Sequence, residues 1–190
     1  MKNNKIIAGV DEVGRGCLAG PVVSAAVILK NGIDLKHIKD SKKINFFNRL
    51  KIADYIKKNS CYAIGTASVD EIFKFNILKS SLLSMKRAVE KLSKKPDLIL
   101  IDGNFSPEGL KNCKTIINGD EKVKCISAAS IVAKTYRDLL MIKLSEKFNN
   151  YAWERNFGYG TKEHLSSLKK FGITSHHRKG FKPVHNILTR

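Results

Sequence analysis

Short apolar segments, typical of buried strands, alternate along this chain with longer segments of helical periodicity. Apolar runs predict strands at residues 5–11, 21–29, 60–68, 98–101 and 113–117. Apolar residues that recur every three or four positions predict helices at residues 43–58, 76–93, 127–148 and 162–171. Strands come first, and helices then alternate with strands. This order favours a mixed α/β sheet with helices on its faces.

The length of 190 residues corresponds to one domain, or to one domain with a small appendage. Folding at this size buries roughly 70% of the surface of the unfolded chain, so a core can form without disulfides. The four cysteines show no C-x-x-C spacing and are interpreted as free thiols in a reducing compartment. The chain shows no signal-peptide pattern and no apolar run near the ~18–20 residues of a membrane span. We therefore expect a cytoplasmic protein with no membrane partner.

The charge is the most unusual part of the composition. Lys and Arg number 35 and Asp and Glu number 17, which gives a formal net charge of +18. The excess is strong in residues 1–60, with twelve basic and five acidic residues, and in residues 162–190, where Glu163 faces seven basic residues. Such a charge favours a polyanionic partner, either nucleic acid or an anionic membrane surface. A lysine-rich proteome or a generic association with ribosomes would also explain it.

Acidic residues close two of the predicted strands. Asp11 and Glu12 follow the first apolar run, and Asp102 follows the run at 98–101. Neighbouring strand residues face opposite sides, so Asp11 and Glu12 share one site only if their strand ends or bulges there. A strand that delivers a carboxylate at its carboxyl end is a common element of active sites in α/β sheets. Solvated turns are the alternative for these acids, and for Asp120, in an Asn-Gly-Asp sequence, a turn is the better interpretation.

Carboxylates that meet in space repel one another and require a cation. Because oxygen ligands stand here without cysteine or closely paired histidine, magnesium or manganese fits such a site better than zinc. Two such ions can bind the attacking water and the leaving oxygen of a phosphodiester. We interpret the four histidines of the C-terminal region, whose spacing matches no standard zinc pattern, as surface residues. These are His164, His176, His177 and His185.

Three other segments contain residues suited to phosphate, sugar or base. The glycines of Gly14-Arg15-Gly16 allow main-chain groups to approach a ligand closely. A dinucleotide site is disfavoured here, because a strand and not a helix follows. Lys42 lies either at a helix start or on a phosphate. Tyr159, between two glycines, either anchors a loop on the core or stacks on a sugar or base.

Taken together, these motifs strongly resemble the type 2 ribonucleases H, and specifically the bacterial ribonuclease HII family. The match opens with D-E-V-G-R-G and L-A-G-P-V at residues 11–22. It continues through D-S-K at 40–42, L-I-D-G at 100–103, G-D at 119–120, S-A-A-S-I-V-A-K at 127–134, R-D at 137–138, G-Y at 158–159, T-K-E-H at 161–164 and F-x-P-V at 181–184. The order is that of the family across nearly the whole chain, and the combination is far more specific than any single motif.

The resemblance implies a ribonuclease H-like fold, with a five-stranded mixed sheet flanked by helices and a small helical C-terminal region. We expect one domain over residues 1–190, in which residues from about 150 to 190 form a substrate-binding helical appendage. The implied activity is endonucleolytic cleavage of the RNA strand of RNA–DNA hybrids, with Mg²⁺ or Mn²⁺, leaving 5′-phosphate and 3′-hydroxyl ends. Incision on the 5′ side of single ribonucleotides in duplex DNA, by a monomer, belongs to the same expectation.

The resemblance also implies roles for particular residues. The metal-binding catalytic carboxylates are Asp11, Glu12, Asp102 and Asp120. The substrate-binding residues are Gly14, Arg15, Gly16, Lys42 and Tyr159. Among them, the Gly-Arg-Gly loop and the tyrosine are expected to recognise the ribose at an RNA–DNA junction.

Two alternative functions are consistent with part of the sequence. A non-enzymatic basic RNA-binding protein would explain the charge, but it has no need of acids at the ends of two apolar strands. A related metal nuclease of the same fold could act on another substrate, as a resolvase does. The Gly-Arg-Gly loop and the Gly-Tyr pair favour ribose recognition over that alternative.

Overall fold

The computed structural model describes residues 5–33 and 45–189, and these residues contain the expected sheet. Its five strands are β1 (Ile7–Val13), β2 (Val22–Leu29), β3 (Ser60–Ala67), β4 (Leu98–Asp102) and β5 (Cys113–Ile116), in the order β3-β2-β1-β4-β5. Strand β2 pairs antiparallel with β1 and β3, whereas β4 pairs parallel with β1 and β5. The sheet is therefore mixed, and the carboxyl ends of β1, β4 and β5 point the same way.

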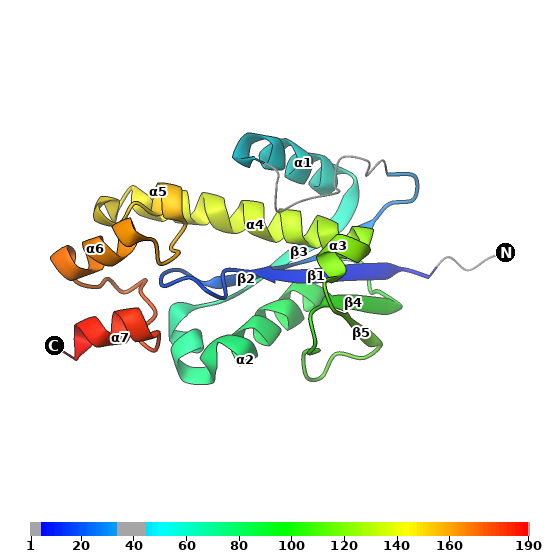
Figure 1. Cartoon of the computed structure of the whole chain (residues 1–190). Coiled ribbons are helices and arrows are strands. Elements are labelled where there is room, and N and C mark those ends of the chain that lie inside the picture. Colours follow the sequence, from blue (N-terminus) through cyan, green and yellow to red (C-terminus); the bar gives the residue numbers. More distant parts are fainter. Residues whose placement is uncertain (1–4, 34–44, 190) are drawn as a thin grey trace.

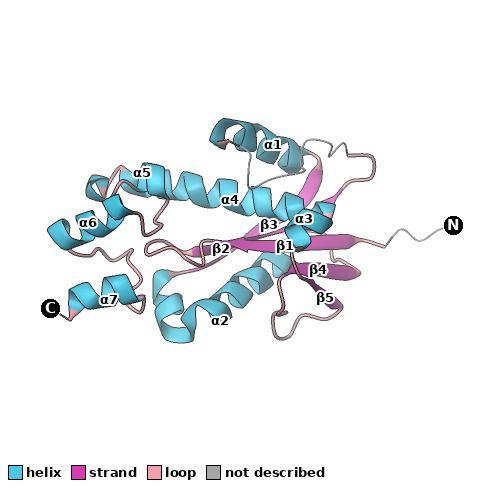
Figure 2. Cartoon of the chain, viewed as in Figure 1, coloured by secondary structure: helices cyan, strands magenta, loops and turns pink. Residues whose placement is uncertain are grey.

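Helices cover both faces of this sheet (Figures 1 and 2). Helices α1 (Phe46–Lys58) and α4 (Lys124–Ser145) lie on one face, and α2 (Val69–Glu90) lies on the other. The shorter helices are α3 (Gly119–Lys122), the 3₁₀ helix η1 (Asn149–Tyr151), α5 (Trp153–Asn156), α6 (Lys162–Phe171) and α7 (Lys182–Leu188). None of the helices in residues 5–33 and 45–189 is both long and apolar enough to cross a membrane.

The central strands are apolar on both sides because helices cover both sides. In β2, Ala25 packs in a cluster with Ile56 of α1 and Val132 of α4, whereas Ala26 packs with Met85 of α2. This follows from the alternation of side chains along a strand. The apolar run in the sequence thus corresponds to a strand buried between two helical layers.

Helix α4 approaches β1 so closely that no side chain fits between them. A Cβ built on Gly9 would lie 2.2 Å from the backbone carbon of Cys125, in the first turn of α4. Ala128 and Ala129, about one turn further along α4, are small and fully buried. This close contact holds the amino-terminal half of α4 over the part of β1 that precedes Asp11.

The predicted strand and helix positions are confirmed, with differences in their bounds. Helix α6 has the predicted bounds, whereas α4 begins and ends three residues before the expected 127–148. Helix α2 begins at Val69, seven residues before the expected start at residue 76. Its start is set by Ser68 and Glu71, which form a capping box. The periodicity starts late because α2 is kinked at Asn76, where φ is 68°.

The C-terminal helices pack around the end of α4 (Figure 1). Their apolar cluster joins Trp153, Leu168 and Val184 to Met141 of α4 and to Leu18 in the loop after β1. Residues from 150 onward therefore share a core with the segment that follows the first predicted acids. This places the C-terminal region beside the Gly-Arg-Gly loop.

Candidate active site

Three of the predicted carboxylates, those of Asp11, Glu12 and Asp102, gather where β1 and β4 run side by side. Val10 pairs with Ile101, so Asp11 and Asp102 occupy the next position of two parallel strands. The carboxylate of Asp102 accepts a hydrogen bond of 2.6 Å from the backbone N–H of Gly119, at the start of α3. Asp120 follows Gly119 and is buried, and its carbonyl accepts a hydrogen bond from the Ser127 hydroxyl. All four predicted acids thus belong to the carboxyl ends of parallel strands or to the residues just beyond them.

From the sequence, we expected Asp11 and Glu12 to share one site only if their strand ends or bulges there. Strand β1 does neither. Asp11 pairs with Ala25 and Glu12 with Ser24, and the pairing with β2 continues without interruption to Val13. What ends is the pairing with β4, whose last partner on β1 is Val10. The acids therefore lie where β1 has a neighbour on one side only, and this opens the side next to Asp102.

The electrostatics of these acids show that they lie close together. Burial raises the pKa of Asp11 well above its usual range, Glu12 and Asp102 raise it further, and a hydrogen bond to Ser130 of α4 opposes the rise. Burial also raises the pKa of Glu12, an effect that its 3.2 Å ion pair with Arg15 partly offsets. Two ionised carboxylates in such surroundings destabilise each other, and a cation would remove this cost.

The donors fit Mg²⁺ or Mn²⁺ in their chemistry, because all are carboxylate oxygens. In residues 5–33 and 45–189, however, no group of three or more His, Cys, Asp or Glu side chains is arranged so that it could hold an ion as it stands. Glu12 is turned toward Arg15, and Asp11 accepts a hydrogen bond from the N–H of Glu12. Metal binding would require such side chains to turn from these partners toward a common point.

The glycine-rich loop, residues 14–21, connects β1 to β2. Gly14 has a φ of +92°, and a Cβ there would lie 2.2 Å from the Nε atom of Arg137. Gly14 is therefore required by the fold itself. A Cβ on Gly16 would meet no atom within 4 Å, so the open approach expected of both glycines is seen at Gly16. The Arg15 side chain is half exposed and bonds to Glu12.

Tyr159 lies against this loop although about 140 residues separate them in the sequence. The N–H of Leu18 donates a 2.7 Å hydrogen bond to the carbonyl of Gly158. The Tyr159 hydroxyl is hydrogen-bonded to the thiol of Cys17, and burial raises the pKa of Tyr159 to about 12. The residue as a whole is 38% exposed, so part of Tyr159 remains accessible although its hydroxyl has a partner. The structure thus brings together all the predicted recognition elements except Lys42, which lies outside the described residues.

The prediction of surface histidines is wrong at two of the four positions. His164 and His177 have no exposed surface, and their Nε2 atoms lie 3.1 Å apart. Trp153 Nε1 donates to His164 Nε2, the N–H of Thr174 donates to His177 Nδ1, and His164 Nδ1 lies 2.9 Å from the carbonyl of Tyr159. Burial lowers the pKa of His177 to about 3, so the ring is neutral. The spacing of histidines in a sequence reports on metal binding, whereas their burial depends on tertiary packing.

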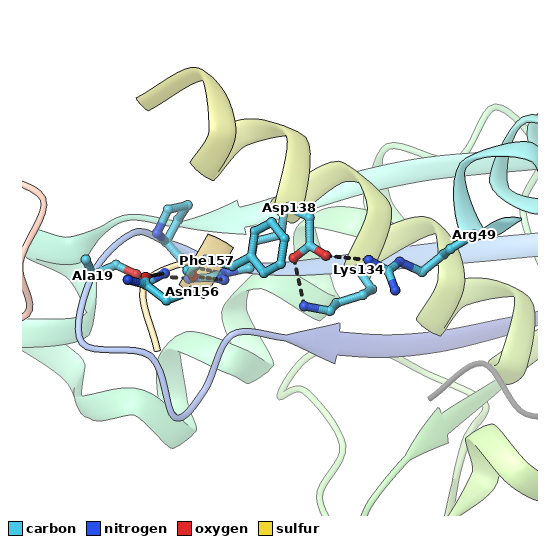
Figure 3. Close-up of polar contacts among 9 residues, drawn as sticks. Ala19, Arg49, Lys134, Asp138, Asn156 and Phe157 are labelled. Atoms are coloured by element: carbon cyan, nitrogen blue, oxygen red, sulfur yellow. Dashed lines mark hydrogen bonds and ion pairs between the residues drawn. The ribbon is translucent and has the colours of Figure 1, made fainter. Parts of the chain in front are cut away.

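A buried ion-pair network, which sequence reasoning missed, lies behind Tyr159. Asp138 is fully buried and accepts hydrogen bonds from Arg49 (2.6 Å) and Lys134 (2.7 Å), as Figure 3 shows. The Lys134 ammonium also lies 4.9 Å from the ring centre of Phe157 and 5.5 Å from that of Tyr159. The spacing of Lys134 and Asp138, four residues apart on one helix, is the local signal that could have indicated this pair.

Comparison with known proteins gives a consistent set of relatives. The family model for ribonuclease HII matches residues 8–184. A ribonuclease HII of Pelagibacter ubique (strain HTCC1062) is 59% identical over 97% of this chain and 100% of its own length. A ribonuclease HII of Ruegeria pomeroyi (strain ATCC 700808 / DSM 15171 / DSS-3) is 52% identical over 96% of this chain and 78% of its own length.

Solved structures show the same similarity in three dimensions. The ribonuclease H2 of Pyrococcus horikoshii OT3 superposes with a TM-score of 0.81, at 25% identity and over 97% of each chain. The ribonuclease HII in a complex with PCNA from Archaeoglobus fulgidus has a TM-score of 0.73, at 26% identity and over 96% of each chain. A Bst ribonuclease HIII in complex with Mn²⁺ has a TM-score of 0.71 at 19% identity, over 97% of this chain and 70% of its own, which is a likeness of fold.

Proposed function

Because this chain belongs to the ribonuclease HII family and is therefore a ribonuclease H, we propose that it also incises duplex DNA on the 5′ side of single ribonucleotides. Hydrolysis breaks the bond between phosphorus and the upstream 3′-oxygen, leaving a 3′-hydroxyl and a 5′-phosphate. Family membership removes the non-enzymatic RNA-binding alternative. The observation that carries the proposal is the position of the acids: Asp11, Glu12 and Asp102 interact with one another, and Glu12 pairs with Arg15 of the glycine-rich loop. Arg15 and Gly16 are the exposed part of this loop, and the turn that contains Tyr159 is hydrogen-bonded to it.

Members of this family depend on divalent metal, and we assign the metal ligands to the four carboxylates Asp11, Glu12, Asp102 and Asp120. Two ions of Mg²⁺ or Mn²⁺ at this position would neutralise the scissile phosphate and activate water. The protein's own contribution is to hold acidic oxygens where repulsion already disfavours their ionised form. Ser130 and the N–H of Gly119 orient Asp11 and Asp102 for this role.

Substrate selection is assigned to Gly14, Arg15, Gly16 and Tyr159. Only the 2′-hydroxyl distinguishes a ribonucleotide from its deoxy counterpart at one site in a duplex. Gly16 offers open space for a sugar, and the face of the Tyr159 ring offers a stacking surface. Because the Tyr159 hydroxyl already bonds to Cys17, stacking by the ring is the favoured contact.

The C-terminal helices extend this surface. We assign residues from about 150 to 190 to substrate binding, because their core includes the glycine-rich loop and α6 exposes Lys162, Lys169 and Lys170. Lys42 is assigned to phosphate binding from its motif alone. A cytoplasmic monomer completes the proposal.

Mapping of the cut on three labelled duplexes tests the proposal. The substrates are an RNA–DNA hybrid, a DNA duplex with one ribonucleotide, and the same duplex in DNA only, each with Mg²⁺ or Mn²⁺. We expect cleavage of the first two, with the cut of the second on the 5′ side of the ribonucleotide. Cleavage of the DNA-only duplex, or a cut elsewhere, would contradict the assigned selection. Cleavage of the hybrid alone would limit the function to the hybrid.

A further inference from the structure

Two arginines with no appreciable exposed surface lie behind the glycine-rich loop. Arg137 belongs to α4, and Arg178 lies in the segment between α6 and α7. Buried arginines normally form ion pairs with carboxylates. Among the residues that the structure describes, neither of these has a carboxylate oxygen within 4.0 Å, and both guanidinium groups donate to backbone carbonyls.

Arg137 joins the glycine-rich loop to the turn that precedes Tyr159. Its Nε and Nη2 atoms donate to the carbonyls of Pro21 (3.0 Å) and Ala19 (2.9 Å). Its Nη1 atom donates to the carbonyl of Phe157 (2.8 Å), two residues before Tyr159. One rigid guanidinium thus fixes the separation of two segments that sequence places far apart (Figure 3 shows Ala19 and Phe157).

Arg178 donates hydrogen bonds to other carbonyls of the same loop. Its Nε atom donates to the carbonyl of Gly20 (3.0 Å) and its Nη1 atom to that of Arg15 (2.8 Å), while its backbone N–H donates to Leu18 (2.8 Å). The Nη2 atom is buried and has no hydrogen-bond partner among the described residues. Burial lowers the pKa of Arg178 to about 10, which shows that the fold destabilises this charge.

Burying two cations without carboxylate partners is energetically unfavourable, and this indicates that the two arginines have a role beyond packing. A loop with left-handed glycines at positions 14 and 20 has no regular hydrogen-bond ladder, so its shape depends on the donors that reach its carbonyls. Neutral side chains could supply donors, but only arginine supplies three in a fixed planar fork. Their unneutralised charge also adds to the positive potential beneath the loop.

We propose that Arg137 and Arg178 are positioning residues that fix the glycine-rich loop against Tyr159 and thereby set the selection of ribonucleotides. This inference rests on the proposed function of the loop and Tyr159. A displacement of a recognition element by about 1 Å can reduce a rate by about a hundredfold. Loss of either guanidinium group should therefore reduce cleavage at a single ribonucleotide far more than cleavage of a long hybrid. A long hybrid offers many positions at which the enzyme can bind and cut.

The test compares Arg178→Lys and Arg178→Gln, and likewise Arg137→Lys, on the hybrid and on the single-ribonucleotide duplex. We expect kcat on the single-ribonucleotide duplex to fall by about a hundredfold for each variant, and by less than about tenfold on the hybrid. Arg178→Gln, which also removes charge, should raise KM on both substrates, and Arg178→Lys should restore KM without restoring kcat. Full junction activity in Arg178→Lys would overturn the positioning role.

Arg87→Lys is the matched control, because Arg87 of α2 donates to the carbonyl of Thr66 and to the carboxylate of Glu71, and the change removes a similar fork. It should lower the thermal midpoint without changing the ratio of the two activities. Should Arg178→Gln fail to fold, the two lysine variants, which keep the buried charge, decide the test; equal losses on both substrates overturn the inference. Lack of discrimination by the wild type against the DNA-only duplex would instead refute the proposed function.

Discussion

Asp11 combines almost complete burial with two acidic neighbours, and this combination reduces stability at neutral pH. Because its pKa is raised in the folded state, the folded protein binds this proton more tightly than the unfolded chain does. The free energy of unfolding therefore falls as pH rises from the ordinary value of 3.8 through the raised pKa. A functional site that is locally unfavourable without its ligand is a common trade of stability for activity.

We predict that Asp11→Asn stabilises the metal-free protein and abolishes cleavage. In EDTA at pH 8 the thermal midpoint should rise, by about 2–4 °C for each kcal/mol of relieved strain. Added Mg²⁺ should raise the midpoint of the wild type more than that of the variant, because ligands stabilise the state that binds them. Asp54→Asn, on the exposed face of α1, should change neither property. A lower midpoint for Asp11→Asn in EDTA would contradict this account of the acids.

Gly16 should be important for the substrate and unimportant for the fold. Gly16→Ala adds a methyl group to open space, so the free energy of unfolding should stay within about 0.5 kcal/mol of the wild type. Cleavage at a single ribonucleotide should fall, because the methyl group occupies the space assigned to the sugar. Denaturant unfolding and cleavage assays on one preparation test both parts. Unchanged cleavage would show that substrate does not approach the loop at Gly16.

At the scale of elements, the site depends on how α4 and the C-terminal helices are held. Gly9 allows α4 to contact β1 directly, and this brings Ser130 to Asp11. At the other end of α4, the pair His164 and His177 ties α6 to the segment that carries Arg178. Both histidine rings must be neutral to keep this arrangement, since each pKa is lowered by burial.

This arrangement predicts an acid-sensitive C-terminal region. The folded pKa of His177, about 3, lies below its ordinary 6.5, so the unfolded chain binds the proton first. Stability from this group is fully present above about pH 6.5 and is lost as pH falls toward 3. His177→Gln should lower stability at pH 7.5 and flatten its pH dependence between pH 4 and 7; His185→Gln, at an exposed position, is the control. Parallel curves for wild type and His177→Gln would disprove this link.

At the scale of the whole molecule, the chain combines a net charge of +18 with a candidate site made of carboxylates. A positive surface would attract the phosphate backbone of the proposed substrate, and the acidic site is where a cation is needed. Lys169 and Lys170 of α6 are exposed in the C-terminal region beside the loop. Lys94 and Lys95 are equally exposed, but they precede β4 and thus lie at the opposite end of the parallel strands from the acids.

The position of these lysines predicts which charges contribute to binding. The slope of log K against log salt should be about −0.9 for each phosphate that the protein neutralises on B-form duplex. The double change Lys169→Ala and Lys170→Ala should reduce the magnitude of this slope by about two, because each phosphate contact contributes about one. The double change Lys94→Ala and Lys95→Ala removes the same charge and should leave the slope unchanged. Equal effects of the two pairs would show that net charge, and not its position, determines binding.

The sequence alone determined the order of the elements and proposed the acids of the site. Apolar runs and periodicity report which residues of one element are buried, and they predicted the five strands and α6 correctly. The acids that follow the apolar runs of β1 and β4 were predicted for the same reason, since a charged residue that ends an apolar run is visible locally. The family motifs then proposed roles for Asp120 and Tyr159, which periodicity alone left as turn and loop residues.

Only the tertiary structure decided which segments meet. Nothing near residue 137 or 178 indicates that their guanidinium groups lie against residues 14–21, because these contacts join segments more than 100 residues apart. The burial of His164 and His177, and the reason for glycine at position 14, depend on the same packing. Local patterns describe the surface of each element, whereas the energy of a buried charge or ring depends on the atoms that other elements bring against it.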